Sequence, residues 1–250
     1  MGQNTSLKKA IMILKRLSKE PYEMSALDLS NELGLNRSTI HRILNSLIEE
    51  ELVFQNSLSR KYSLGPVAYS IGMGYLNNNN KIDQIKNILE ELAKNSQQSI
   101  GYAKLVGEKI MNVIEIEGYQ VVKIGYKPGN FYPINCGVYG KTIMAFFKPY
   151  SRLEEIVYSY DFRKRGPNTI MNPNDLLKEY EEIRQKGYAT SDGEVGKGIM
   201  GIGAPVRDLS GRVVGCVGVA YIKEALNEDE TKELKQQIIK SADRVSQLIL

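Results

Sequence analysis

Apolar residues recur with helical spacing in two short stretches between residues 24 and 48. The first stretch carries Ala26, Leu29 and Leu33, and the second carries Ile40, Ile43, Leu44, Leu47 and Ile48. These spacings place each set on one face of a helix. Ser25, with Asp28 after it, is suited to begin the first helix, while Gly34 can end it and Asn36 can cap the second. The break is long enough only for a tight corner, so the pattern predicts a helix-turn-helix.

The opposite face of the second helix is polar and basic over its first turns. Its residues are Arg37, Ser38, Thr39, His41, Arg42 and Asn45. Solvated helix faces usually mix Glu with Lys, whereas the first acidic residue here is Glu49. Side chains of these types bond to phosphates and base edges in the major groove. We therefore expect a DNA recognition helix, the alternative being an ordinary solvated face.

A predicted β-hairpin follows this helix. Two short β-like runs, residues 52–54 and 60–65, flank a polar turn at residues 55–59, and Arg60 and Lys61 follow the turn. A basic hairpin after a recognition helix is typical of a wing that contacts the phosphate backbone. Upstream, residues 5–18 repeat apolar side chains at helical spacing and predict a helix that packs on the pair; its stripe is Leu7, Ala10 or Ile11, Leu14 and Leu17. We place this all-α/β winged helix-turn-helix domain in residues 1–65.

The remaining chain alternates strand-like and helical patterns. Residues 66–80 mix apolar residues with glycine and end in four asparagines, and residues 81–98 have helical spacing. Predicted strands occupy 100–106, 109–116, 120–126, 201–208 and 212–221, and the first three suggest an antiparallel meander. Predicted helices occupy 138–148, 151–158, 174–186 and 228–250. This order predicts an α+β fold around an antiparallel sheet.

Composition narrows the class of protein. The 250 residues are 42% hydrophobic and 25% charged with a net charge of only +4, so DNA affinity would have to come from a local basic surface. Cys136 and Cys216 lie far apart without a CxxC, which favours a reducing compartment over disulfides or a zinc finger. Neither a leader-like segment nor an apolar run of about 20 residues is present, so we expect a cytoplasmic protein with no membrane partner.

Sequence motifs do not support catalysis or a cofactor. GKGIMG (196–201) matches a dinucleotide fingerprint but leads into a strand, and NCGVYGKT (135–142) lacks the first glycine of a phosphate loop. His41 is the only histidine and lies on the predicted DNA face, so it is not available for a Ser-His or Cys-His pair. Cys136, Cys216, Asp161 and Asp192 have no metal-ligand spacing. We expect no enzyme activity, no cofactor and no bound metal.

The segment around GLNRSTIHRIL (34–44), followed by KYSLG (61–65), resembles the IclR family of bacterial transcription regulators. Members share a GLxxSTxHRLL-like recognition helix and a YxLG at the end of the wing. Residues 121–145, 183–208 and 211–220 are also similar to family patterns. The resemblance implies a linker helix at residues 66–80 and a GAF-like effector-binding domain at residues 81–250.

The resemblance also implies where a small-molecule effector binds. Its contacts would fall on Val121, Ile124, Val138, Tyr139, Gly140, Ser191, Gly201, Gly218 and Ala220. A helix that begins near Tyr139 or Gly140 would suit a carboxylate. Small-acid sensors have hydroxyls where this chain has Gly218 and Ala220, and a small residue where it has Tyr139, which favours an aromatic or larger apolar effector. Alternatively, the small residues allow close packing and Tyr139 is a core residue.

Together these patterns predict a regulator that binds a double-stranded DNA operator of pseudo-palindromic sequence as a homo-oligomer, a dimer or a dimer of dimers. The linker helix would offer an apolar side to a second copy through Val67, Ala68, Ile71, Tyr75 and Leu76. An enzyme with an appended winged domain and a winged-helix protein-interaction module are the alternatives.

Overall fold

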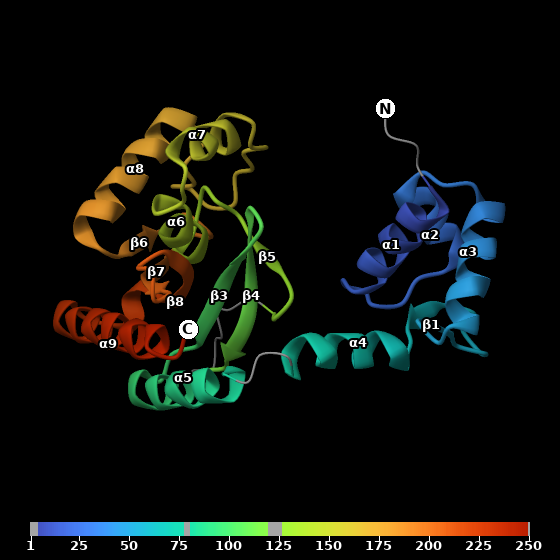
Figure 1. Cartoon of the computed structure of the whole chain (residues 1–250), viewed down its shortest axis with the longest axis horizontal. Helices are drawn as coiled ribbons and strands as arrows, with labels where there is room; N and C mark the ends of the chain where they lie inside the picture. Colours follow the sequence, from blue (N-terminus) through green and yellow to red (C-terminus); the bar gives the residue numbers. More distant parts are fainter. Residues whose placement is uncertain (1–4, 78–80, 120–126, 250) are drawn as a thin grey trace. The chain divides into compact units, whose positions relative to one another are not determined.

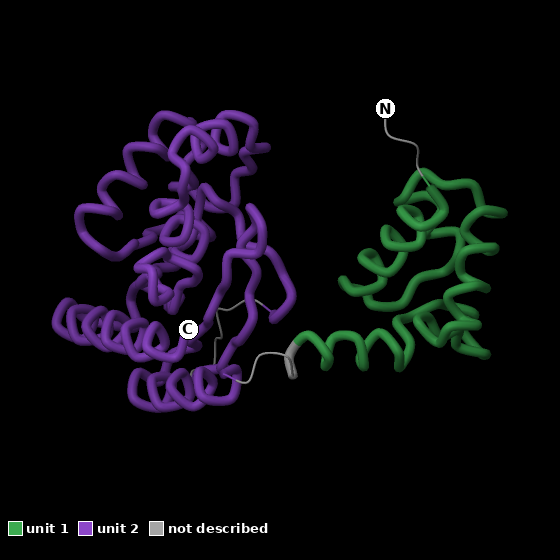
Figure 2. The backbone as a smooth tube through the Cα atoms, viewed as in Figure 1, with its two compact units in different colours: residues 1–80 green, residues 81–250 purple. Residues whose placement is uncertain are grey.

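The corner predicted at Gly34 separates two helices in the computed structural model, which describes residues 5–77, 81–119 and 127–249. The chain divides into two compact units, residues 1–80 and residues 81–250 (Figure 2). The predicted strand at residues 120–126 lies outside the described residues.

Helices α2 (Ala26–Leu33) and α3 (Arg37–Glu49) form the helix-turn-helix (Figure 1). The Ser25 hydroxyl accepts a hydrogen bond from the Asp28 amide, and the Asp28 carboxylate accepts one from the Ser25 amide at 3.1 Å, a reciprocal capping box. Gly34 ends α2 in the left-handed conformation, with φ +63°. Asn36 stands at the N-cap of α3 as predicted, but its side chain makes no capping hydrogen bond.

Helix α1 (Ser6–Leu17) packs on this pair with a face that shares most, but not all, of the predicted stripe. Ile13 and Leu17 are buried, whereas Leu7 is 71% exposed and Ile11 is 42% exposed. Ile13 and Leu17 are four residues apart and share a face, while Leu7 and Ile11 lie on another. The predicted stripe was therefore wrong at Leu7, while Ala10, and not its alternative Ile11, packs against the core together with Leu14 and Leu17.

Strands β1 (Val53–Gln55) and β2 (Tyr62–Leu64) form the predicted wing. The second strand begins at Tyr62, so Arg60 and Lys61 belong to the loop instead of the strand. Tyr62 also exchanges two backbone hydrogen bonds with Met24, of 3.0 and 2.7 Å, which tie the wing to the start of the helix-turn-helix. Helix α4 (Pro66–Asn77) follows the wing and completes the described part of this unit.

The second unit is built on a six-stranded antiparallel sheet of order β5-β4-β3-β8-β7-β6 (Figure 1). The strands are β3 (Ile100–Val106), β4 (Lys109–Ile116), β5 (Phe131–Tyr132), β6 (Ala189–Asp192), β7 (Ile199–Arg207) and β8 (Val213–Ile222). The sequence patterns missed β5, which has only two residues, and β6, whose four small or polar residues include no large apolar side chain to mark the buried face.

Helices cover both faces of this sheet. One face packs against α5 (Ile82–Ser96) and α9 (Glu228–Ser246). The other packs against α6 (Val138–Ala145), beside which lie α7 (Tyr150–Tyr158) and α8 (Pro173–Lys186). Two predicted helices end early: α6 stops before residue 148, where Pro149 disfavours helical backbone, and α9 stops at Ser246.

Alternation along the strands separates the two cores. On β8, Val217, Val219 and Tyr221 belong to the core with α5 and α9. Cys216 belongs to the core with α6, and a Cβ on Gly218 would lie 3.1 Å from Val138 of α6. Small residues on this face let α6 approach the sheet closely. The structure thus confirms the predicted fold class, a winged helix-turn-helix unit followed by an α+β unit.

Candidate DNA interface and effector cavity

The recognition helix α3 is oriented by its apolar residues. Ile40, Ile43, Leu44 and Leu47 are buried in the core of unit 1. This burial turns the predicted DNA-binding residues outward: Arg37, Ser38, His41, Arg42 and Asn45 are exposed, and Thr39 is half-buried. The pattern places the six side chains on one accessible surface.

The basic side chains of α3 and of the wing loop are not neutralised by ion pairs within the described part of the chain. Arg37 and Arg42 of α3 and Arg60 and Lys61 of the wing loop are exposed, and none of them forms an ion pair with another described residue. The guanidinium of Arg42 donates one long hydrogen bond, 3.4 Å, to the Ser6 hydroxyl. Unpaired cations on a helix face and a hairpin are what contacts with phosphates and guanine require.

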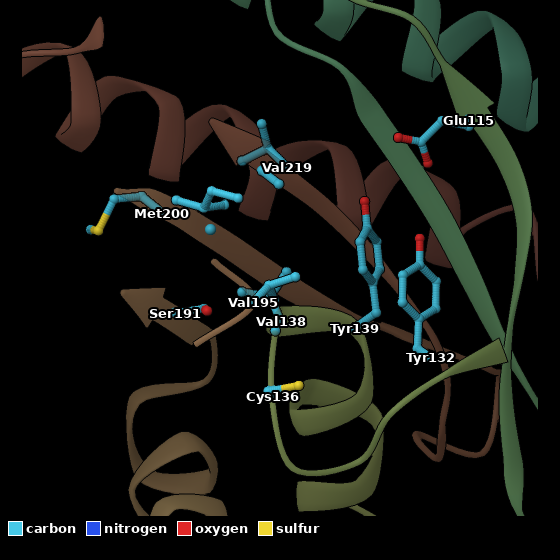
Figure 3. A pocket seen from close by; sticks show the side chains of 13 residues that line it. Glu115, Tyr132, Cys136, Val138, Tyr139, Ser191, Val195, Met200 and Val219 are labelled. Atoms are coloured by element: carbon cyan, nitrogen blue, oxygen red, sulfur yellow. The ribbon is translucent and has the colours of Figure 1, made fainter. Parts of the chain in front are cut away.

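The second candidate site is a cavity between the start of α6, β6 and the middle of the sheet (Figure 3). Its described lining consists of Glu115, Tyr132, Cys136, Gly137, Val138, Tyr139, Ser191, Val195, Ile199, Met200, Gly201, Val219 and Ala220. The lining is mostly apolar. The cavity has a volume of about 30 Å³. That is room for a few waters.

Five of the nine predicted effector contacts line this cavity, namely Val138, Tyr139, Ser191, Gly201 and Ala220. The structure places Gly140 and Gly218 outside the lining, as packing positions. A Cβ on Gly140 would lie 1.8 Å from the Pro133 carbonyl oxygen, and Gly218 lies against Tyr139. Val121 and Ile124 lie outside the described residues.

Sequence reasoning missed eight lining residues. Cys136, Gly137 and Val195 flank predicted positions in the chain, and Ile199, Met200 and Val219 lie on the two strands that carry Gly201 and Ala220. Their proximity in sequence was the available signal. Glu115 and Tyr132 come from β4 and β5, and only the strand order brings them to this place.

Tyr139 is held firmly in the cavity wall. Its hydroxyl donates a 2.8 Å hydrogen bond to the Gly218 carbonyl oxygen, and its ring stacks on Tyr132 with centroids 4.3 Å apart. Burial raises the pKa of the Tyr139 phenol well above 10, so the group is neutral. The side chain is therefore an uncharged aromatic wall with its only hydroxyl proton already donated.

A buried ionic network joins the two sides of the cavity. The Lys141 ammonium on α6 donates to Glu179 on α8 and to the Thr190 carbonyl, both at 2.7 Å, and to Glu194 at 2.5 Å. The other carboxylate oxygen of Glu194 accepts the Gly137 amide at 2.9 Å. Burial raises the pKa of Glu194, and Lys141 opposes that rise. The network fixes the start of α6 relative to the segment after β6.

The cysteines have no exposed or reactive character. Both are buried and free, and burial raises the pKa of Cys136 to about 11 and that of Cys216 to about 12. Among residues 5–77, 81–119 and 127–249, no group of three or more His, Cys, Asp or Glu side chains is placed to hold a metal ion. No helix in the same ranges is long and apolar enough to cross a membrane.

A winged helix-turn-helix unit with an exposed basic helix, joined to an α+β unit with an internal cavity, defines a class: two-domain transcription regulators. Comparison with known families makes the assignment specific. The bacterial transcriptional regulator IclR C-terminal domain matches residues 73–247, and the IclR helix-turn-helix domain matches residues 6–57. The chain belongs to the IclR family of bacterial transcription regulators.

Individual relatives are similar over their whole length. The HTH-type transcriptional regulator KipR of Bacillus subtilis is 25% identical over 248 residues, which are 99% of this chain and 98% of KipR. An IclR transcriptional regulator from Alicyclobacillus acidocaldarius has a similar fold, with a TM-score of 0.85 at 23% identity over 97% of this chain and 98% of that one. An IclR homologue from Microbacterium hydrocarbonoxydans, complexed with 4-hydroxybenzoate, gives a TM-score of 0.80 at 17% identity, covering 97% and 99%.

Proposed function

We propose that this regulator binds a pseudo-palindromic DNA operator through α3 and the wing, and that a small organic molecule in the cavity of the second unit controls this binding. The observation that carries the proposal is the outward basic face of α3. Its apolar residues are buried, so Arg37, Arg42 and Asn45 face away from the core. The N-terminal half of a recognition helix contacts base edges in this geometry.

The wing has a separate role in this proposal. Arg60 and Lys61 lie in an exposed loop, where they would contact phosphates and position α3 in the groove. Within the loop, the Asn56 side chain accepts hydrogen bonds from the amides of Leu58 and Ser59, which gives the basic residues a defined backbone support.

The effector is proposed to be an organic acid or an aromatic molecule. Apolar side chains such as Val138, Val195 and Val219 suit a hydrocarbon body, and Ser191 supplies a hydroxyl. An IclR homologue is complexed with 4-hydroxybenzoate, which supports a small organic effector for a chain of this fold. The regulator is proposed to have no catalytic activity, as its named relatives are regulators.

The operator-binding form is proposed to be a dimer or a dimer of dimers. One helix and one wing cover a half-site, so specific binding normally needs two copies. Unit 1 carries exposed apolar side chains that could pack on a second copy: Leu7 and Ile11 on α1, and Tyr69, Ile71 and Tyr75 on α4. Val67 and Ala68 are half-buried.

DNA binding measured against salt concentration tests the proposal. The full chain is used to select a bound sequence from a random DNA pool, and its affinity is then measured as salt rises. An operator-binding regulator should lose affinity steeply, because each phosphate contact releases counterions. A winged-helix module that binds only protein would select no sequence and show no salt-dependent DNA affinity.

A further inference from the structure

The side chain of Tyr139 fills the part of the cavity between the start of α6 and the middle of the sheet. Only 6% of the residue is exposed, although it belongs to the cavity wall. Figure 3 shows its ring beside that of Tyr132, with both hydroxyl ends pointing toward the side of Glu115. The rings are stacked at an interplanar angle of 23°.

Two glycines form the slot that holds this ring. Gly101 of β3 and Gly218 of β8 are direct partners in the sheet. A Cβ on Gly101 would lie 2.4 Å from the Tyr139 hydroxyl oxygen, and a Cβ on Gly218 would lie 2.9 Å from ring carbon Cε1. Glycine inside a strand commonly marks a close approach of another group. Here the approaching group is a phenol from the chain itself.

The contacts of Tyr139 are those that a bound phenol would make. The ring has an aromatic partner in Tyr132, and the hydroxyl has a backbone acceptor in Gly218 at 2.8 Å. The cavity left beside the ring has a volume of only about 30 Å³. An apolar cavity that accepts benzene is about 150 Å³ in volume. A ring-bearing ligand therefore does not fit beside Tyr139 in this arrangement.

We propose that Tyr139 is the specificity-determining residue of the effector cavity: its phenol occupies the place of an aromatic ligand and restricts the site to slender, aliphatic molecules. Such a ligand would lie against Val195, Met200 and Val219. The inference rests on the proposed function in taking this cavity as the effector site. It removes aromatic molecules from the proposed effectors, because Tyr139 and not a larger ligand occupies the space that Gly218 leaves open.

The test removes the Tyr139 phenol by mutation and adds p-cresol, a free molecule with the same ring and hydroxyl. Thermal unfolding of the full chain is followed by circular dichroism with increasing p-cresol, for the wild type, Tyr139→Ala and Tyr139→Phe. Tyr139→Ala should show a melting temperature that rises with p-cresol, because a ligand that binds only the folded state stabilises it. The wild type and Tyr139→Phe, whose ring still fills the slot, should show no rise. Equal rises in all three proteins, or no rise in Tyr139→Ala, would overturn the proposal.

Two further variants keep the test decisive if Tyr139→Ala does not fold. Tyr139→Val leaves the slot open with a smaller loss of packing and has the same expected response to p-cresol. Gly218→Ala in the otherwise wild-type chain should lower the melting temperature, because the added Cβ meets the ring at 2.9 Å. An unchanged melting temperature would show that the ring does not occupy the slot.

A second measurement separates this inference from the proposed function. The affinity of Tyr139→Ala for the selected DNA is measured with and without p-cresol. A change in DNA affinity with p-cresol supports both the role of Tyr139 and the control of DNA binding through this cavity. A thermal shift without any change in DNA affinity supports the role of Tyr139 but contradicts control of DNA binding through this cavity.

Discussion

Lys141 both stabilises the second unit and positions the start of α6. It is fully buried, and its ammonium has three hydrogen-bond acceptors within 2.7 Å, on Glu179, Thr190 and Glu194. A buried ammonium is stable only when its charge and its donors are compensated in this way. Because Glu194 also accepts the Gly137 amide, the same network sets the start of α6.

Replacing Lys141 should therefore destabilise the protein strongly. Lys141→Met keeps a long unbranched side chain but leaves Glu194 buried without its cation. Such a change typically lowers the free energy of unfolding by about 3–5 kcal/mol. Urea unfolding of the full chain, followed by circular dichroism, measures the loss. Lys86→Met is the matched control, since Lys86 forms an exposed pair with Glu90 at 3.7 Å and should contribute less than about 1 kcal/mol. Equal losses for the two variants would contradict the role given to Lys141.

Arg37 and Arg42 should each contribute to operator affinity. Alanine at either position should weaken binding to the selected sequence, by about 1–3 kcal/mol where the guanidinium contacts a guanine, with some loss of base preference. Competition binding with single-base variants of the selected DNA measures both effects. Arg163→Ala removes one exposed charge from the second unit and should leave affinity unchanged. Unchanged affinity in both α3 variants, with folding intact, would remove the assignment.

At the scale of elements, sequence periodicity was informative where one face of a helix is buried. It predicted the helix-turn-helix, the wing and most helices of the second unit. It failed at Leu7 of α1, which is apolar and exposed, because periodicity alone does not tell where along an apolar stripe the packing ends. It also missed β5, whose two residues are too few to show a period.

The wing gives a prediction about an element as a whole. Replacing Arg60 and Lys61 together by alanine should weaken binding to all DNA sequences alike, because phosphate contacts carry no base information. The dependence of log affinity on log salt should become shallower by about one unit for each lost contact. Titrations of selected and random DNA over a range of salt concentrations measure this slope. A loss confined to the selected sequence would mean that the wing contacts bases.

The candidate cavity exists only at the scale of the folded second unit. Val138, Tyr139 and Ser191 were predicted from local similarity to a family pattern, and they do line one cavity. Whether Tyr139 faces a ligand or packs as a core residue on the small positions was left open by the sequence, because the filling of the cavity depends on the pairing of Gly101 with Gly218 across β3 and β8. Residues more than a hundred positions apart meet there, and sequence spacing contains no information on that distance.

The whole molecule should be a dimer or a dimer of dimers in solution. Sedimentation velocity of the full chain at micromolar concentration should show no monomer as the main species. Ile71 and Tyr75 lie four residues apart on one face of α4 and are 62% and 46% exposed, and neighbouring exposed apolar side chains of this size usually mark an interface. A two-fold symmetric contact through such a surface would present two recognition helices to the two halves of a pseudo-palindrome.

A charge placed on that surface should separate the copies. Ile71→Asp should shift the sedimentation profile toward monomer and reduce operator affinity together, because both depend on the same contact. Tyr158→Asp is the matched control: Tyr158 on α7 is 58% exposed in the second unit, and a charge there should leave both measurements unchanged. A wild-type chain that sediments only as monomer, with and without operator, would exclude the dimer. An Ile71→Asp chain that remains fully dimeric would instead place the interface elsewhere, with the exposed Leu7 and Ile11 of α1 as the next surface to test.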